Sequence, residues 1–213
     1  LSVVGRSLFE NFEPGIHPSL WSGFGGTVGS TVIATNYGGS VSGVNSLWFG
    51  DGGSRFAATI PVDTSAGGSI SFYLRLASGS VQPWENVDLP GEGIVLEYST
   101  NNGALWTVMG TYNTTTFYNW TQVTTSIPTE ALSSATQFRW RQLSHSGTCC
   151  DHWALDDISV DAGPTPPSIL SQPASQTVKS GSNVAFMISV QGSSPLSYQW
   201  SKDGTNLGDG GRI

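Results

Sequence analysis

A short turn between two alternating segments is the feature that most limits how this chain can fold. Residues 94–99 alternate at period two, and Asn101, Asn102 and Gly103 follow them. Asparagine and glycine are the residues that adopt the positive φ angles of a tight β-hairpin. The chain then restarts at Trp106. We therefore predict an antiparallel hairpin whose polar tip is held by a buried aromatic ring.

The same period of two recurs in other segments. Residues 70–76 and 137–141 each alternate between large apolar and polar side chains, as strands with one face in a core do. The chain has 27 glycines and 11 prolines, and turn residues separate the alternating segments. No long segment has apolar residues at helical spacing. The sequence therefore predicts an all-β chain built as a two-sheet sandwich.

The charge of the chain excludes two classes of partner. Eight Lys and Arg against 15 Asp and Glu give a formal net charge of −7. Nucleic acids and anionic membrane surfaces need clustered basic residues, so we expect neither as a partner. No apolar segment approaches the ~20 residues of a membrane span, so no membrane insertion is expected.

Five stretches carry a resemblance to the reelin-type repeat, a jelly-roll module of extracellular proteins. In chain order they are residues 11–13 with Trp21, residues 46–49 with 51–55, residues 70–76, residues 96–106, and residues 138–142 with 153–157. The resemblance implies a jelly-roll β-sandwich for residues 1–162. The paired cysteines that frame the middle of the family's repeat have no counterpart here. Residues 99–106 also resemble the Asp-box hairpin, with Asn101 in place of the acidic residue.

A proline-rich spacer divides the chain into two predicted domains. The fixed φ of successive prolines makes residues 163–168 a short, stiff linker after the first domain. Residues 169–213 resemble the N-terminal part of an immunoglobulin-like domain, with Trp200 as the core tryptophan of its third strand. The resemblance implies a truncated immunoglobulin-like β-sandwich. It also implies no inter-sheet disulfide, because Ile188 aligns with the first core cysteine.

Two adjacent cysteines, Cys149 and Cys150, are the only ones in the chain. A vicinal disulfide is the favoured prediction, because an extracellular chain offers neither cysteine another partner. Two alternatives stay open. With His145 and His152 they form a zinc-competent set, although adjacent cysteines suit a tetrahedral site poorly. They could also be small buried side chains, or pair with another part of a longer protein.

Four carboxylates are candidates for a structural calcium site. Jelly-roll modules of this kind often hold calcium between the first strand, a mid-chain loop and the last strand. The resemblance places Glu13, Asp51, Asp156 and Asp157 at those three places. Calcium binds several oxygen ligands, and glycine-rich loops can lend carbonyls. The alternative is that Asp156 and Asp157 accept backbone donors, while Glu13 and Asp51 are solvated or pair with arginine.

Catalytic chemistry is not expected. The chain has no nucleophile elbow, no metalloprotease motif and no phosphate-binding loop. Glu85 with Asp88 or Glu92 is the carboxylate pair that a glycosidase could use. We predict that these residues are exposed loop charges instead. With only eight Lys and Arg, an arginine cluster that binds the carboxylate of a sialic acid is not expected either.

A role as a binding module or as an architectural spacer remains as the predicted function. Trp84 and Trp120 fall at expected loops or strand ends, where exposed indole rings could stack on sugars. We predict a non-catalytic, extracellular adhesion or architectural module of a larger secreted or cell-surface protein, with extracellular proteins or glycans as partners. The alternative is a carbohydrate-binding module appended to a secreted enzyme.

Overall fold

The structure is a computed structural model in which β-strands dominate. It describes residues 7–26, 39–76, 87–113, 115–148, 150–163, 167–192 and 196–208. Among these residues, helix is confined to three short 3-10 segments, Pro18–Leu20, Thr115–Tyr118 and Thr129–Ala131. None of the described helices has the length and apolarity of a membrane span. The chain divides into two compact units, Leu1–Gly163 and Pro164–Ile213.

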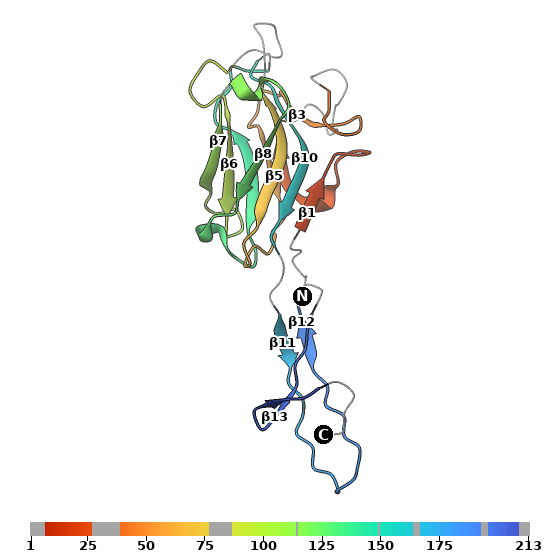
Figure 1. Cartoon of the computed structure of the whole chain (residues 1–213). Coiled ribbons are helices and arrows are strands. Elements are labelled where there is room, and N and C mark those ends of the chain that lie inside the picture. The colour runs from red at the N-terminus through yellow and green to blue at the C-terminus, as the bar shows by residue number, and fades with distance from the viewer. Residues whose placement is uncertain are drawn as a thin grey trace. The chain divides into compact units, whose positions relative to one another are not determined.

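The first unit contains two antiparallel sheets (Figure 1). One sheet runs in the order β1 (Ser7–Glu10), β10 (Trp153–Asp161), β5 (Ser69–Leu76) and β8 (Thr121–Ser126), and β3 (Leu47–Phe49) also pairs with β10. The other sheet runs in the order β2 (Trp21–Gly25), β4 (Phe56–Thr59), β9 (Gln137–Gln142), β6 (Ile94–Ser99) and β7 (Thr107–Tyr112). The predicted jelly-roll β-sandwich is therefore confirmed.

Aromatic rings fill the space between the two sheets. Trp140 of β9 is fully buried, and its ring centroid lies 5.3 Å from that of Phe72 in the other sheet and 6.3 Å from that of Trp21. The predicted inward residues of β5 are all buried: Ile70, Phe72, Leu74 and Leu76. Alternation at period two thus identified the core face of this strand correctly.

The predicted hairpin is also confirmed. Strands β6 and β7 pair antiparallel, and the turn between them has positive φ at Asn102 (58°) and Gly103 (79°). The Ser99 hydroxyl oxygen accepts the N–H of Gly103 at 2.9 Å. The side-chain oxygen of Asn101 accepts the N–H of Leu105 at 2.9 Å. Asparagine therefore supplies the acceptor that the acidic residue of an Asp-box would supply.

Two tryptophans predicted to lie in the core do not. Trp106, which closes the hairpin, is only half-buried, and its ring lies against the Arg139 guanidinium, whose central carbon is 4.1 Å from the ring centroid. Trp200 of the second unit is 41% exposed. Trp48, Trp140 and Trp153 are buried.

The second unit contains two short strand pairs among its described residues. They are β11 (Ser168–Ser171) with β12 (Ser189–Gln191), and β13 (Ser201–Lys202) with β14 (Thr205–Asn206). Phe186 is 50% exposed and, like Trp200, lies outside any buried core of the described residues. The immunoglobulin-like assignment of this unit stays a prediction.

The hairpin turn should depend on the Ser99 hydroxyl. Ser99→Ala removes the acceptor for the N–H of Gly103 and the partner of the Asn101 side chain, which lies 2.9 Å away. We expect the free energy of unfolding to fall by about 1–2 kcal/mol in urea denaturation, the usual effect of losing a partly buried hydrogen bond. Thr100→Ala at the neighbouring exposed position is the control. Equal effects of the two substitutions would contradict this account of the turn.

Candidate functional site

Two strands share one edge of β10 and leave a gap between them. Strand β3 pairs with residues 153–155, and β1 pairs with residues 158–161. Asp156 and Asp157 occupy the gap, where the register with β5 shifts and Asp157 has φ +45°. Because none of the described strands pairs with this edge at the two aspartates, their side chains can hold another segment.

The two aspartates hold the loop that precedes β3. Asp156 Oδ2 accepts the N–H of Val41 at 2.7 Å and that of Ser42 at 3.4 Å. Asp157 Oδ1 accepts the hydroxyl of Ser42 at 2.6 Å. Both residues therefore fix one end of this loop onto the first sheet.

Glu13 holds the other end of the same loop. Its carboxylate accepts the N–H groups of Val44 and Asn45, and it accepts the Asn45 side-chain amide at 3.0 Å. Gly43 lies between the two attachments at φ +56°, and a Cβ there would overlap the Glu13 carboxylate. We call Glu13, Asp156 and Asp157 the carboxylate latch.

Three of the four residues predicted to bind calcium hold this one loop, at its two ends. Asp51 is exposed and lies elsewhere, in the loop between β3 and β4, where its backbone oxygen accepts from Arg55. The latch oxygens already accept N–H and O–H donors, and within the described ranges no three Asp, Glu, His or Cys side chains form a metal-binding group. Burial raises the pKa of Asp156 to about 6, so a cation at this place would offset a real cost of ionisation. Calcium binding by the latch therefore stays a proposal.

A buried arginine organises the end of the sandwich where β4, β6 and β9 meet the connecting loops. Arg55 has no exposed surface, and its guanidinium donates to the backbone oxygens of Asp51 (2.8 Å), Cys150 (3.0 Å), Asp151 (2.9 Å) and Gly147 (2.6 Å). Burial lowers the pKa of Arg55 to about 10, although Asp151 and Asp51 favour the charged form. The side chain is therefore a cation at neutral pH, and it joins two loops.

A buried glutamate joins a third loop to the same network. Glu92 Oε2 accepts the N–H groups of Asp88 and Leu89, and Oε1 accepts the hydroxyl of Ser146 at 2.9 Å. Burial alone would raise the pKa of Glu92, but these hydrogen bonds lower it below the ordinary value. Gln142 links Glu92 to Arg55, because it donates to Glu92 O and accepts from Arg55 Nη1.

The exposed residues of these three loops form one surface. Gly91 O accepts the N–H groups of Leu143 and Ser144, so two of the loops are joined directly. Leu89 is 55% exposed and Leu143 is 51% exposed. His145 Nε2 lies 3.0 Å from Gly53 O. We call residues 50–55, 87–93 and 143–148 the loop end.

The profile of one protein family matches most of the first unit. The Reelin subrepeat B profile covers residues 29–161, which include the strands from β3 to β10. The chain belongs to the Reelin subrepeat B family. The resemblance found in the sequence is confirmed by this match.

Several solved structures have folds similar to that of this chain. The K2 cleaved adhesin domain of Lys-gingipain is 15% identical, with 72% of this chain and 96% of that chain covered and a TM-score of 0.45. The module CBM27-1 of Caldicellulosiruptor saccharolyticus, solved with mannohexaose, is 16% identical, with 74% and 97% covered and a TM-score of 0.43. CBM35 from Paenibacillus barcinonensis is 14% identical, with 71% and 95% covered and a TM-score of 0.37. Likenesses of this size do not indicate what the reelin subrepeat binds.

Several predicted site residues lie apart from the loop network or outside the described residues. Trp84 and Glu85 lie outside the described residues, and Trp120 is partly exposed just before β8. The expectation that Glu92 is an exposed charge is wrong, since it is buried and bound by three donors. A general acid of a glycosidase needs a raised pKa, whereas that of Glu92 is lowered. The sequence pattern does not indicate that Glu92 holds this loop, because its donors are backbone N–H groups of the same loop and the hydroxyl of the distant Ser146.

Cys150 lies inside the Arg55 network. Its side chain is buried and disulfide-bonded, and its backbone oxygen accepts from Arg55. Cys149 lies outside the described residues, so the vicinal pairing stays a prediction. The zinc alternative gains no support from His152, whose imidazole packs against the Trp48 ring at 4.6 Å between centroids.

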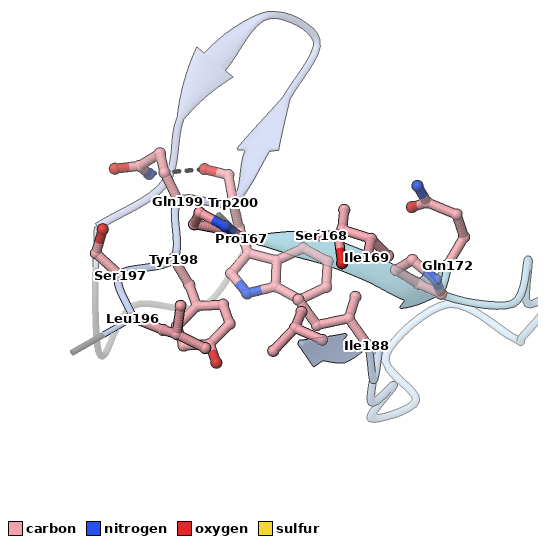
Figure 2. Close-up of a pocket in the computed structure, with 12 residues that line it drawn as sticks. Pro167, Ser168, Ile169, Gln172, Ile188, Leu196, Ser197, Tyr198, Gln199 and Trp200 are labelled. Atoms are coloured by element: carbon pink, nitrogen blue, oxygen red, sulfur yellow. Dashed lines mark hydrogen bonds between the residues drawn. The ribbon is translucent and has the colours of Figure 1, made fainter. Parts of the chain in front are cut away.

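The second unit of the chain has a pocket of its own (Figure 2). Apolar side chains line it, among them Ile169, Ile188, Leu196, Tyr198 and Trp200. Figure 2 shows the Trp200 ring beside Ile188, and Gln199 donates to Trp200 O at 2.8 Å. Sequence reasoning placed Trp200 in a core and missed this hollow.

His152 should make stability depend on pH. Burial, together with the charge of Arg55, lowers the pKa of this imidazole from 6.5 to about 4, although contacts with backbone oxygens oppose the change. Between these values the unfolded chain binds more protons, so the free energy of unfolding should fall as the pH drops from 6.5 to 4. At about 1.4 kcal/mol per pH unit, the loss is on the order of 3 kcal/mol.

Urea denaturation of the parent and of His152→Gln from pH 4 to 7 checks this prediction. The comparison is needed because the raised pKa of Asp156 acts with the opposite sign in the same range. We expect the variant to lose less stability on acidification than the parent. Parallel pH profiles for the two proteins would show that His152 is not the titrating group.

The calcium proposal makes a separate prediction for the carboxylate latch. If the folded state alone binds the ion, calcium at a hundredfold excess over Kd should stabilise it by roughly 2.7 kcal/mol. A chelator should then lower Tm, and Asp156→Ala should abolish this calcium dependence. Asp161→Ala, at an exposed position of the same strand, is the control. A chelator-independent Tm in metal-free protein would leave the latch with only its hydrogen bonds to residues 41–45.

Proposed function

We propose that this reelin subrepeat is a non-catalytic adhesion or architectural binding module of a larger secreted or cell-surface protein. Its loop end is the surface that contacts extracellular proteins or glycans. Membership of the Reelin subrepeat B family supports this proposal. The resemblance to the reelin-type repeat implies a module of extracellular proteins.

The observation that carries the proposal is the buried polar network beneath the loop end. Arg55, Glu92 and Gln142 are buried, and the side chain of each forms hydrogen bonds with backbone groups of the loops. Buried charged groups are not needed to hold two apolar sheets together, and their desolvation is costly. Their effect is to fix exposed loops in one arrangement, which lowers the entropy lost when those loops bind a partner.

Carbohydrate binding is the second candidate function. A different surface favours it, the outer face of the second sheet, where two arginines lie beside aromatic side chains. A module with such a face could equally be attached to a secreted enzyme. The two candidates therefore place the ligand on different parts of the same unit.

Exposed leucines at the loop end allow a direct test of adhesion. The double variant Leu89→Ser/Leu143→Ser removes two large apolar contacts without touching the buried network. We expect retention on immobilised extracellular matrix, measured by surface plasmon resonance, to fall at least tenfold with Tm unchanged. Leu105→Ser is the matched control, because Leu105 is 68% exposed and lies in the turn after β6, whereas residues 87–93 of the loop end come before β6.

Three outcomes would contradict the proposal. The parent protein could show no retention on matrix, or the control could lose as much retention as the double variant. Alternatively, the purified protein could turn over a glycoside, ester or peptide in a way that one point substitution abolishes.

A further inference from the structure

The outer face of the second sheet presents two neighbouring arginines. Arg139 and Arg141 alternate along β9 with Trp140, which points into the core. Both arginines therefore point away from the core. Glu97 of β6 is the cross-strand partner of Arg139 and lies between the two guanidiniums.

Glu97 fixes both arginines. Arg139 reaches its Oε2 through Nε and Nη2, each at 2.7 Å. Arg141 binds it in two-pronged fashion, with Nε 3.0 Å from Oε2 and Nη2 2.7 Å from Oε1. Burial would raise the pKa of Glu97, but hydrogen bonds from Arg141 and Arg139 lower it, so the triad carries one net positive charge.

The accessible part of this triad is cationic. The Glu97 side chain is 3% exposed, whereas those of Arg139 and Arg141 are 19% and 33% exposed. Within the described residues, both guanidiniums make their ion pairs and hydrogen bonds through Nε and Nη2. The Nη1 groups are therefore left to donate to a ligand, and the carboxylate that holds the arginines is shielded from it.

Aromatic side chains flank the triad on both sides. Phe56 is the cross-strand partner of Arg141, and its ring lies over Gly25, where a Cβ would sit 2.6 Å from a ring carbon. The Phe56 ring therefore lies close against the backbone of Gly25 and stays partly exposed. On the other side, Trp106 lies under Arg139 at 4.1 Å and holds that guanidinium in place.

We propose that this face binds glycans that carry carboxylates, such as chains of hexuronic acid. The inference rests on the proposed binding function and names a ligand class and a second surface for it. A guanidinium edge matches a carboxylate in two-pronged geometry, and an exposed flat ring suits a sugar ring. The net positive charge of the triad also complements the negative charge of a carboxylate. Residues 1–163 contain no lysine, so this pair stands out in a chain of net charge −7.

A sugar fits this face better than a peptide does. Peptides commonly bind by adding a strand to a sheet edge or by laying a helix into a groove. The arginines instead lie on β9, an inner strand with β4 and β6 on either side. The sequence led us to expect no arginine cluster, because it could not show that Arg139 and Arg141 share one carboxylate.

Isothermal titration of the full chain with oligogalacturonate tests the proposal. We expect binding that weakens with salt, and at least tenfold weaker binding of methyl-esterified oligogalacturonate, which keeps the rings and loses the charge. Poly-glutamate of equal charge should also bind at least tenfold more weakly, because it lacks sugar rings. Equal binding of poly-glutamate would overturn the proposal in favour of an acidic peptide.

Variants separate the guanidinium geometry from charge and from folding. Arg141→Gln should lose at least tenfold in affinity. Arg141→Lys should lose a similar amount although it keeps the charge, because an ammonium lacks the planar fork. Arg75→Gln, on the outer face of the other sheet, is the control and should bind as the parent does. A uniform loss in all three, or no loss in Arg141→Gln with Tm unchanged, would overturn the proposal.

The loop-end variant distinguishes failure of this inference from failure of the proposed function. Leu89→Ser/Leu143→Ser should bind oligogalacturonate as the parent does. If the parent is retained on matrix but does not bind oligogalacturonate, the inference fails and the proposed function stands. If it binds neither, both fail.

Discussion

A guanidinium removed from water needs an oxygen acceptor for its N–H groups, and Arg55 shows how far that requirement reaches. Its acceptors come from the loop before β4, from Gln142 and from the segment around Asp151. Since an unsatisfied charge would be very costly here, these loops are held in the one arrangement that satisfies it. The surface of the loop end is thus a consequence of a buried cation. The aromatic core alone would leave these loops without such a constraint.

A similar principle operates at the edge of the first sheet. Among the described residues, β3 and β1 leave two positions of this edge of β10 without a neighbouring strand, and the carboxylates of Asp156 and Asp157 bind a loop there instead. Asp156 and Asp157 then hold loop residues that lie 115 positions away in the sequence. Sheet irregularities of this kind often place polar side chains for a specific use. In this chain the hydrogen bonds of the two aspartates attach Val41 and Ser42 to the sheet.

The two surfaces of the first unit differ in what they offer a partner. The loop end combines exposed leucines with polar loop residues, over a network whose charges are hidden. The outer face of the second sheet carries two guanidiniums and hides the one carboxylate that orients them. The two proposals therefore assign different partners to different surfaces of one unit. Both surfaces rely on buried charged groups that set the geometry of exposed ones.

Local chemistry determined the strands and the hairpin, and these were predictable from sequence. Period-two alternation marks the buried face of β5, and Asn102 with Gly103 permits the positive φ of the turn. The partners of polar side chains were not predictable, because they come from distant positions. Arg55 and Asp151 are 96 residues apart, and Glu97 and Arg139 are 42 apart. Sequence placed Glu13, Asp156 and Asp157 in one region through resemblance, but only the fold decided that their carboxylates bind the loop of residues 41–45. Strand formation depends on neighbours in sequence, whereas a buried charge is satisfied by whatever the tertiary structure brings beside it.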